Sequence, residues 1–315
     1  MKNLLTGILI AGVTGFMIGT PCAAGPDGNT IKRTVKVGDL SRTYYLHVPA
    51  TLPKDKAAAL VLAFHGGGGA PAQFERVCGF NDLADREGFL VAYPEGIGKS
   101  WNDGRGVEAT QAQSENVNDL AFVAALLDDA EKSYRIDEKR VFATGISNGG
   151  IFSQYLAANL SSRIAAIAPV AGGLPEPSGP GFNPGKSVSV LILQGVADPL
   201  VPYNGGDVTV FRKKHGRILD TDETVKKWVE HDGCTREAVV EDVPDTDPGD
   251  GCRVKKFTYA QGRDGTEVVL YRIEGGGHTW PDGRSALPEM LVGKICRDFN
   301  GTAIICAFFK AHPKP

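Results

Sequence analysis

Short apolar runs alternate with amphipathic stretches along most of the chain. The runs are rich in β-branched residues, and the stretches between them carry apolar residues at helical spacing. This alternation is typical of a parallel sheet whose strands are joined by crossover helices. The clearest helical face is formed by five apolar residues, Leu120, Val123, Ala124, Leu127 and Ala130. The pattern predicts an α/β fold with a mostly parallel central sheet and helices on both faces.

The pattern also predicts where the elements lie. The expected strands are residues 42–48, 59–64, 89–93, 140–144, 165–170, 189–194 and 268–273. The expected helices are residues 71–86, 116–134, 148–160, 221–231 and 300–311. Segments 95–114 and 172–185 follow expected strands and are rich in Gly with Asn, Gln or Pro. They are either binding loops, which α/β folds place there, or simple surface connections.

The N-terminus has the features of an export signal. A positive Lys2 precedes an apolar stretch over residues 4–18, and small residues lead up to Gly25. A retained anchor is the alternative, but the apolar stretch is shorter than the roughly 20 residues that span a bilayer. We expect a signal peptide over residues 1–24, cleavage near Ala24, and a secreted or periplasmic protein whose single catalytic domain covers residues 25–315.

The net charge limits which partners are expected, and the cysteine content indicates the cellular compartment. The formal net charge is −3, and the one short basic cluster, residues 212–217, is typical of a solvated face. We therefore expect no nucleic-acid partner and no stable membrane association. Five of the six cysteines lie beyond the signal, which suits an oxidising compartment. Cys234 and Cys252 flank a turn-rich acidic segment and are the predicted disulfide, while no Cys or His spacing predicts a structural metal.

One serine lies where a catalytic nucleophile is expected. Ser147 is the centre of a G-x-S-x-G sequence that follows an expected strand and precedes an expected helix. That order predicts the nucleophile elbow of an α/β-hydrolase, in which a sharp turn exposes the hydroxyl group. A chain with 40 glycines can produce the pentapeptide by chance, so its strand-turn-helix setting carries the prediction.

A serine nucleophile needs a histidine base oriented by a carboxylate. In α/β-hydrolases the acid and then the histidine follow the serine along the chain. His278 is the one histidine in a glycine-rich loop directly after a late strand, and Asp198 follows the strand at 189–194. Asp220 and Asp222 are less well placed alternatives for the acid.

The oxyanion formed during ester hydrolysis needs backbone N–H donors. One expected donor is the N–H of Asn148, directly after the nucleophile. The other is expected from the glycine run after the strand at 59–64, with Gly67 as the candidate and its neighbours as alternatives. This chemistry requires neither a metal nor an organic cofactor.

Several motifs occur in the order found in one known family. The chain resembles the secreted polyhydroxybutyrate depolymerase and feruloyl esterase group from about residue 34 to residue 312. The motifs that carry the resemblance are His65-Gly66-Gly67, residues 84–96, Trp101-Asn102, residues 145–150, Ala197-Asp198-Pro199 and residues 276–281. The resemblance implies that Ser147, Asp198 and His278 form the triad. It also implies that Trp101 and Trp280 line the substrate cleft, with a buried core aromatic as the alternative for either.

The sequence thus predicts a serine carboxylic-ester hydrolase that works through an acyl-enzyme. The expected substrates are small or oligomeric esters with an aromatic, feruloyl-type, or short hydroxyacyl group. A polyhydroxybutyrate-oligomer depolymerase is the alternative within this class. A peptidase and a non-catalytic glycan-binding protein are the rivals outside it.

Overall fold

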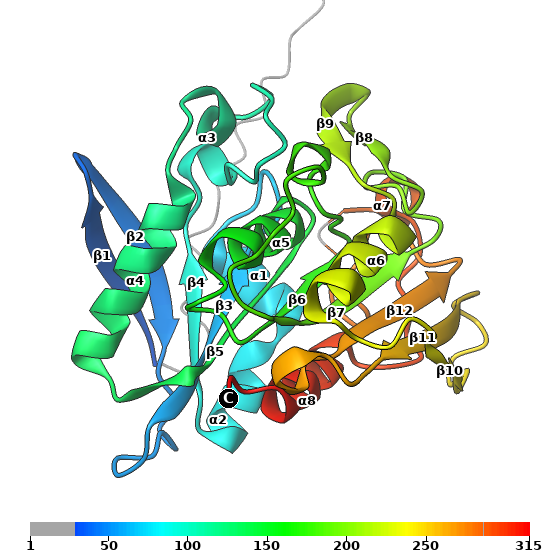
Figure 1. The fold of residues 1–315 in the computed structure, drawn as a ribbon. Coiled ribbons are helices and arrows are strands. Elements are labelled where there is room, and N and C mark those ends of the chain that lie inside the picture. The colour runs from blue at the N-terminus through cyan, green and yellow to red at the C-terminus, as the bar shows by residue number, and fades with distance from the viewer. Residues whose placement is uncertain (1–28, 286) are drawn as a thin grey trace, which may run out of the picture.

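The protein is built on one ten-stranded β-sheet. The computed structural model describes residues 29–285 and 287–315. The strands are β1 (Thr30–Val37), β2 (Leu40–His47), β3 (Ala58–Phe64), β4 (Leu90–Pro94), β5 (Ile136–Ile146), β6 (Ala166–Val170), β7 (Ser189–Gly195), β10 (Val239–Val243), β11 (Arg253–Tyr259) and β12 (Val268–Glu274). Their order across the sheet is β1-β2-β4-β3-β5-β6-β7-β12-β11-β10 (Figure 1). A separate hairpin pairs β8 (Gly206–Val210) with β9 (Lys213–Ile218).

The middle of the sheet is parallel and its two edges are antiparallel. β4, β3, β5, β6, β7 and β12 run in one direction, while β1 and β2 on one side and β11 and β10 on the other complete the sheet with antiparallel pairs. Strands covered on both faces are largely apolar, as β4, β6 and β7 are: every residue of each is buried, and β7 adds only the polar Ser189 and Gln194. The predicted α/β-hydrolase architecture is therefore confirmed.

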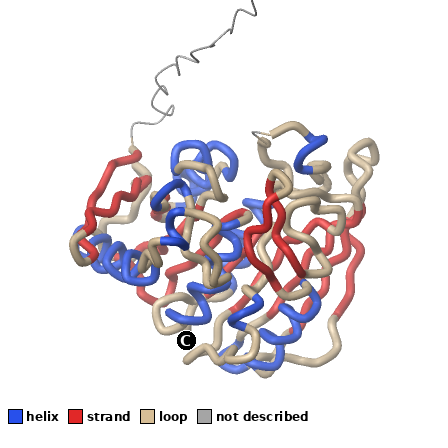
Figure 2. The backbone as a smooth tube through the Cα atoms, turned by 90° about the horizontal axis from the view of Figure 1, so that it is seen from above, coloured by secondary structure: helices blue, strands red, loops and turns tan. Residues whose placement is uncertain are grey.

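Helices cover both faces of this sheet. The helices are α1 (Pro71–Cys78), α2 (Phe80–Glu87), α3 (Gln111–Ser114), α4 (Asp119–Ser133), α5 (Asn148–Leu160), α6 (Thr221–Asp232), α7 (Glu289–Val292) and α8 (Gly301–Ala311). One face packs against α4, α5 and α6 through a core that includes Phe122, Phe152 and Trp228. The other face packs against α1, α2 and α8 through a second core (Figures 1 and 2).

The differences from the predicted elements have local causes. The helix expected at 71–86 is two helices, because Gly79 lies between them with φ 64° in the left-handed region, where glycine is unstrained. β10 was not predicted, because four of its five residues are exposed at the sheet edge and show no alternation of apolar and polar positions. β1 and β11 were also not predicted, because charged residues interrupt both: Lys32, Arg33 and Lys36 in β1, and Lys255 and Lys256 in β11.

The predicted pairing of Cys234 with Cys252 is wrong. Cys252 lies directly before β11, whereas Thr235, next to Cys234, donates its N–H to the carbonyl of Ala260, just past the other end of that strand. Seven strand residues separate the two sites by roughly 20 Å, far more than the Cα separation of a disulfide. The thiol of Cys234 instead contacts the carbonyl of Thr266 at 3.8 Å.

The predicted signal peptide, residues 1–24, lies outside the described residues. Over the part of the chain that the structure describes, no helix combines the length and the apolar character needed to span a membrane.

Candidate active site

Ser147 is held in a strained turn between β5 and α5. Its backbone has φ 58° and ψ −125°, a conformation that a residue with a side chain adopts only when its surroundings enforce it. The surroundings are close: a Cβ added to Gly149 would lie 2.2 Å from the carbonyl oxygen of Phe64. The N–H of Ser147 donates to Val170 on the neighbouring strand β6. This is the geometry that the nucleophile-elbow prediction requires.

Asp198 and His278 are 80 positions apart in the chain and are hydrogen-bonded in the structure. The Nδ1 of His278 donates to Oδ2 of Asp198 at 2.8 Å, and both side chains are buried. The other carboxylate oxygen of Asp198 accepts the N–H groups of Leu200 and Val201, each at 2.8 Å. The backbone N–H groups of Leu200 and Val201 therefore hold the carboxylate in place, and the carboxylate orients the imidazole ring of His278.

The two alternative acids have other roles. Asp220 is the N-cap of α6 and accepts the N–H groups of Asp222 and Glu223. Asp222 accepts the hydroxyl of Tyr203 at 2.6 Å. Asp198 alone of the three candidates contacts His278.

The sheet brings Ser147, Asp198 and His278 together at the C-terminal ends of its parallel strands. They follow the C-terminal ends of β5, β7 and β12, and these strands are parallel with only β6 between β5 and β7. The loop that carries His278 is joined to the loop of Asp198, because Ala197 donates its N–H to Gly276 at 3.0 Å. Ligands of open α/β sheets bind at this edge.

Two free backbone donors lie beside the nucleophile. Asn148 begins α5, so its N–H has no partner within the helix, and no other acceptor contacts it among the described residues. Gly69 donates its N–H to Gly66 within the glycine loop and Gly68 donates to Lys99 in the loop after β4, whereas the Gly67 N–H has no acceptor in the described ranges. A Cβ on Gly67 would lie 3.6 Å from that of Asn148, so the two backbones are neighbours. The predicted donors are therefore brought together.

The side chain of Asn148 ties the start of α5 to segment 95–118. Its Oδ1 accepts the N–H of Trp101 at 2.8 Å, and its Nδ2 donates to Asp103 at 2.6 Å. Asp103 is fully buried and also binds the guanidinium of Arg105 and the amide of Gln113. Sequence reasoning missed this buried network, because nothing in the spacing of these residues marks them as partners.

His65 is a second missed residue, and it anchors the glycine loop. Its Nδ1 donates to Gly66, and its Nε2 accepts the N–H of Gly96 at 3.1 Å, which fixes the tautomer. Burial lowers the pKa of His65 to about 4. The neutral ring joins the donor loop after β3 to the loop after β4. Its position before the glycine run was the only sequence signal for this role.

Both tryptophans expected in the cleft are core residues instead. Trp101 is 0% exposed, stacks on Phe152 and donates its indole N–H to the carbonyl of His65. Trp280 is 2% exposed and donates to the hydroxyl of Thr302. Each indole is satisfied inside the protein, so the substrate-binding prediction is wrong for both and the core-aromatic alternative holds.

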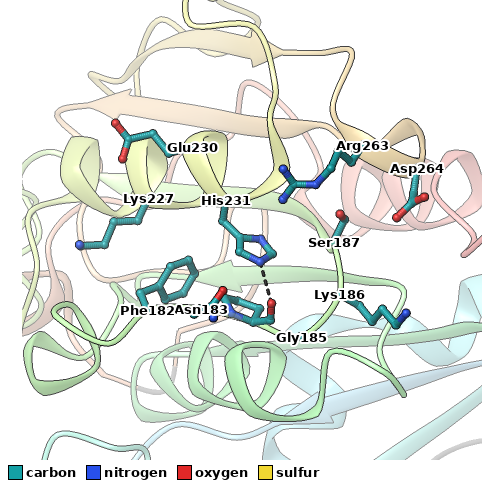
Figure 3. A pocket seen from close by; sticks show the side chains of 11 residues that line it. Phe182, Asn183, Gly185, Lys186, Ser187, Lys227, Glu230, His231, Arg263 and Asp264 are labelled. Atoms are coloured by element: carbon teal, nitrogen blue, oxygen red, sulfur yellow. Dashed lines mark hydrogen bonds between the residues drawn. The ribbon is translucent and has the colours of Figure 1, made fainter.

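A cavity of about 640 Å³ lies away from these residues (Figure 3). It is lined by residues 182–187, the C-terminal half of α6, and Arg263 with Asp264. These segments precede β7 and β12, whereas Asp198 and His278 follow the same two strands. The cavity therefore lies at the N-terminal ends of these strands, whereas the candidate site lies at their C-terminal ends.

One group of side chains in the described part of the chain has the composition of a metal site. Asp250, Cys252 and Cys296 place one ligand atom each within 4.8 Å of one another, and all three are buried. They lie beside the loop that carries His278 but share no residue with the Ser147, Asp198 and His278 set.

Comparison with known proteins places the chain among esterases. Residues 40–176 match the family described as Esterase PHB depolymerase. A putative esterase, NocK, from Nocardia uniformis subsp. tsuyamanensis is 34% identical over 293 residues, which is 89% of this chain and 83% of that protein. Feruloyl esterase B from Piromyces equi is 29% identical over 77% of this chain, which spans 44% of that longer protein. Among solved structures, the acetyl xylan esterase from Aspergillus awamori superposes with a TM-score of 0.61 at 17% identity, covering 89% of this chain and 99% of that one.

Proposed function

This chain belongs to the esterase PHB depolymerase family, and we propose on that premise that it is an exported carboxylic-ester hydrolase with Ser147 as its nucleophile. The observation that carries the proposal is the buried contact between His278 and Asp198 at the edge of the sheet where the strained Ser147 turn also lies. A buried carboxylate that orients a histidine near a strained serine is the arrangement that acyl transfer needs.

The reaction proceeds in two steps. His278 removes the proton of the Ser147 hydroxyl as the oxygen attacks the ester carbonyl, and the N–H groups of Asn148 and Gly67 stabilise the oxyanion. The protonated imidazole then gives its proton to the leaving alcohol, which leaves an acyl-enzyme. Water, activated by the same imidazole, releases the acid and restores the serine. Asp198 keeps the Nδ1–H of His278 pointing away from the serine throughout.

The proposed substrates are esters of aromatic, feruloyl-type acids or of short hydroxy acids. The first class is supported by the similarity to a named feruloyl esterase and the second by the family description. Comparing turnover of methyl ferulate with turnover of a hydroxybutyrate trimer decides between them. Faster turnover of the trimer favours the depolymerase alternative.

Replacing the nucleophile tests the mechanism. We expect Ser147→Ala to lower kcat on p-nitrophenyl acetate by up to about 10⁶-fold, because no other hydroxyl occupies the elbow. Ser153→Ala is a matched control, since that serine lies in the same helix and bonds only the carbonyl of Gly149. A fluorophosphonate probe should label wild-type protein on Ser147 and leave the Ser147→Ala variant unlabelled.

Two results would overturn the proposal. Equal, near-background rates for wild type and Ser147→Ala on all esters, without labelling, would favour a binding protein on this fold. Turnover of an aminoacyl anilide without any turnover of esters would favour a peptidase.

A further inference from the structure

Two buried thiols from distant parts of the chain face each other beside the histidine loop. The sulfur atoms of Cys252 and Cys296 lie within 4.8 Å of each other, and the residues are 0% and 1% exposed. Cys252 precedes β11, and Cys296 lies in the segment between α7 and α8. Rotation about χ1 moves a cysteine sulfur by a few ångströms, so a separation of this size is within reach of a disulfide bond.

Three of the four carboxylate oxygens beside the pair accept backbone N–H groups, and the fourth, Oδ2 of Asp298, lies 3.8 Å from the thiol of Cys296. Asp250 accepts the N–H of Cys252 on one oxygen and the N–H of Arg297 on the other, each at 2.6 Å. Oδ1 of Asp298 accepts the N–H groups of Thr246 and Asp247. Asp250 holds the two cysteine segments together, and both of its oxygens are used by backbone groups. It is therefore poorly available as a metal ligand, which favours a covalent bond between the sulfurs over a bound cation.

We propose that Cys252 and Cys296 form a disulfide bond in the exported protein. One thiolate attacks an oxidising disulfide, supplied by a thiol–disulfide oxidoreductase or by glutathione disulfide, and forms a mixed disulfide. The second thiolate then attacks the sulfur of its partner in the chain and displaces the oxidant's thiol. Two thiols lose two protons and two electrons, and the oxidant gains both as two thiols.

Burial indicates when this bond forms. Both cysteines are almost completely buried in the folded protein, so a disulfide reagent reaches their sulfur atoms poorly once the site is packed. Oxidation is therefore expected during folding, before β11 is covered, and the finished bond is shielded from reductants.

The bond would fix the loop that carries His278. The segment around Cys296 runs alongside this loop: Gly277 donates to Lys294 at 2.9 Å, His278 donates to Val292, and Asp282 donates to Cys296 at 2.8 Å. Cys252 lies at the start of β11, whose first residue Arg253 pairs with Glu274 at the end of β12, where the loop begins. A disulfide would thus link the two segments that flank the His278 loop, which are the start of β11 and the segment around Cys296. The existence of the bond rests on the proposed export but not on the esterase activity, whereas its effect on activity rests on both.

Peptide mapping without reduction tests the bond. Trypsin cleaves after Arg236, Arg253, Lys294 and Arg297, so the proposal predicts that peptide 237–253 is linked to peptide 295–297 with the loss of two hydrogen atoms, in full-length protein exported through an oxidising compartment. Alkylation in denaturant should then label three of the five cysteines beyond residue 24. The linked peptide should persist in Cys234→Ser and Cys306→Ser and disappear in Cys252→Ser and in Cys296→Ser.

Two results would overturn the bond. One is five alkylated thiols in wild-type protein folded with a glutathione redox pair, with or without a stoichiometric metal found by elemental analysis. The other is a link from either cysteine to a different partner.

A thermal measurement tests the structural role. Closing a loop of this length should raise Tm by on the order of 10 °C, so adding reductant in mild denaturant should lower the Tm of wild type by that amount. The Cys252→Ser/Cys296→Ser double variant should show no change with reductant, and equal shifts in both proteins would contradict the role in holding the loop.

Discussion

At the scale of single residues, the site depends on a few buried polar groups whose partners are fixed by the backbone. Asp198 shows this most clearly, because two N–H groups of its own turn hold one oxygen while His278 binds the other. A carboxylate held in this way needs no side-chain reorganisation when the histidine becomes charged during the reaction.

Replacing this carboxylate should act on kcat. In Asp198→Asn the amide can donate to the histidine ring and favour the wrong tautomer, so we expect kcat to fall by about 10⁴-fold with little change in KM. Asp222→Asn is the matched control, since Asp222 accepts a bond from Tyr203 and does not contact His278. Steady-state kinetics on p-nitrophenyl acetate measure both. A larger loss in Asp222→Asn than in Asp198→Asn would contradict the assignment.

His65 should make the stability of the protein depend on pH. Its folded pKa of about 4 lies below the ordinary histidine pKa of about 6.5, so the unfolded chain binds the proton first as the pH falls. Its contribution is present above about pH 6.5 and is lost as the pH falls through about 4, by on the order of 3 kcal/mol in the free energy of unfolding. Urea unfolding at pH 7 and pH 4.5 should show a smaller loss in His65→Gln. Equal losses in both proteins would contradict this.

At the scale of elements, the first turn of α5 is the part that determines the site. In the proposed mechanism its first N–H, that of Asn148, binds the oxyanion, and the side chain of Asn148 binds this turn to the loop at Trp101 and Asp103. The loop after β3 is bound to the same region through His65. The two donors are thereby positioned by side chains from α5 and from the loops after β3 and β4.

Removing the Asn148 side chain should loosen this arrangement without removing its N–H. We expect Asn148→Ala to lower kcat by about 10- to 100-fold while KM changes little, because the donors act mainly in the transition state. Asn159→Ala is the control, since Asn159 lies in the last turns of the same helix and its amide bonds only the carbonyl of Tyr155. Equal kcat values for wild type and Asn148→Ala would show that the loops position the donors unaided.

At the scale of the whole molecule, a large parallel sheet covered on both faces provides a rigid base for loops at one edge. The two cores on either side of the sheet pack α4, α5 and α6 against one face and α1, α2 and α8 against the other. Rigid central strands allow the loops after them to differ among relatives while the strand ends stay in place. The proposed export also affects the whole molecule, because it removes the N-terminal segment.

Export should leave a shortened chain. When the gene is expressed with its own N-terminus in a secreting host, we expect the protein outside the cytoplasm to begin at or near Gly25. Intact-mass measurement and N-terminal sequencing check this result. A full-length chain recovered in the membrane fraction would support the retained anchor instead.

Much of the fold was readable from local pattern, because buried parallel strands are continuous apolar runs. The expected strand at 189–194 and helix at 148–160 match β7 and α5 to within a residue. Edge strands were missed because half of their residues or more face solvent, as in β10. The burial of Trp101 and Trp280 and the contacts of Cys234 could not be predicted from the sequence either, since they depend on elements far away in the chain.

By itself, the sequence determined the α/β class and the candidate Ser147, Asp198, His278, Asn148 and Gly67, because periodicity and turn chemistry are local properties. Only the tertiary structure decided which of three aspartates contacts His278, that both tryptophans are core residues, and that Cys252 lies beside Cys296 and not Cys234. These are contacts between segments tens of residues apart, and strand order and loop path, which no local pattern encodes, set them.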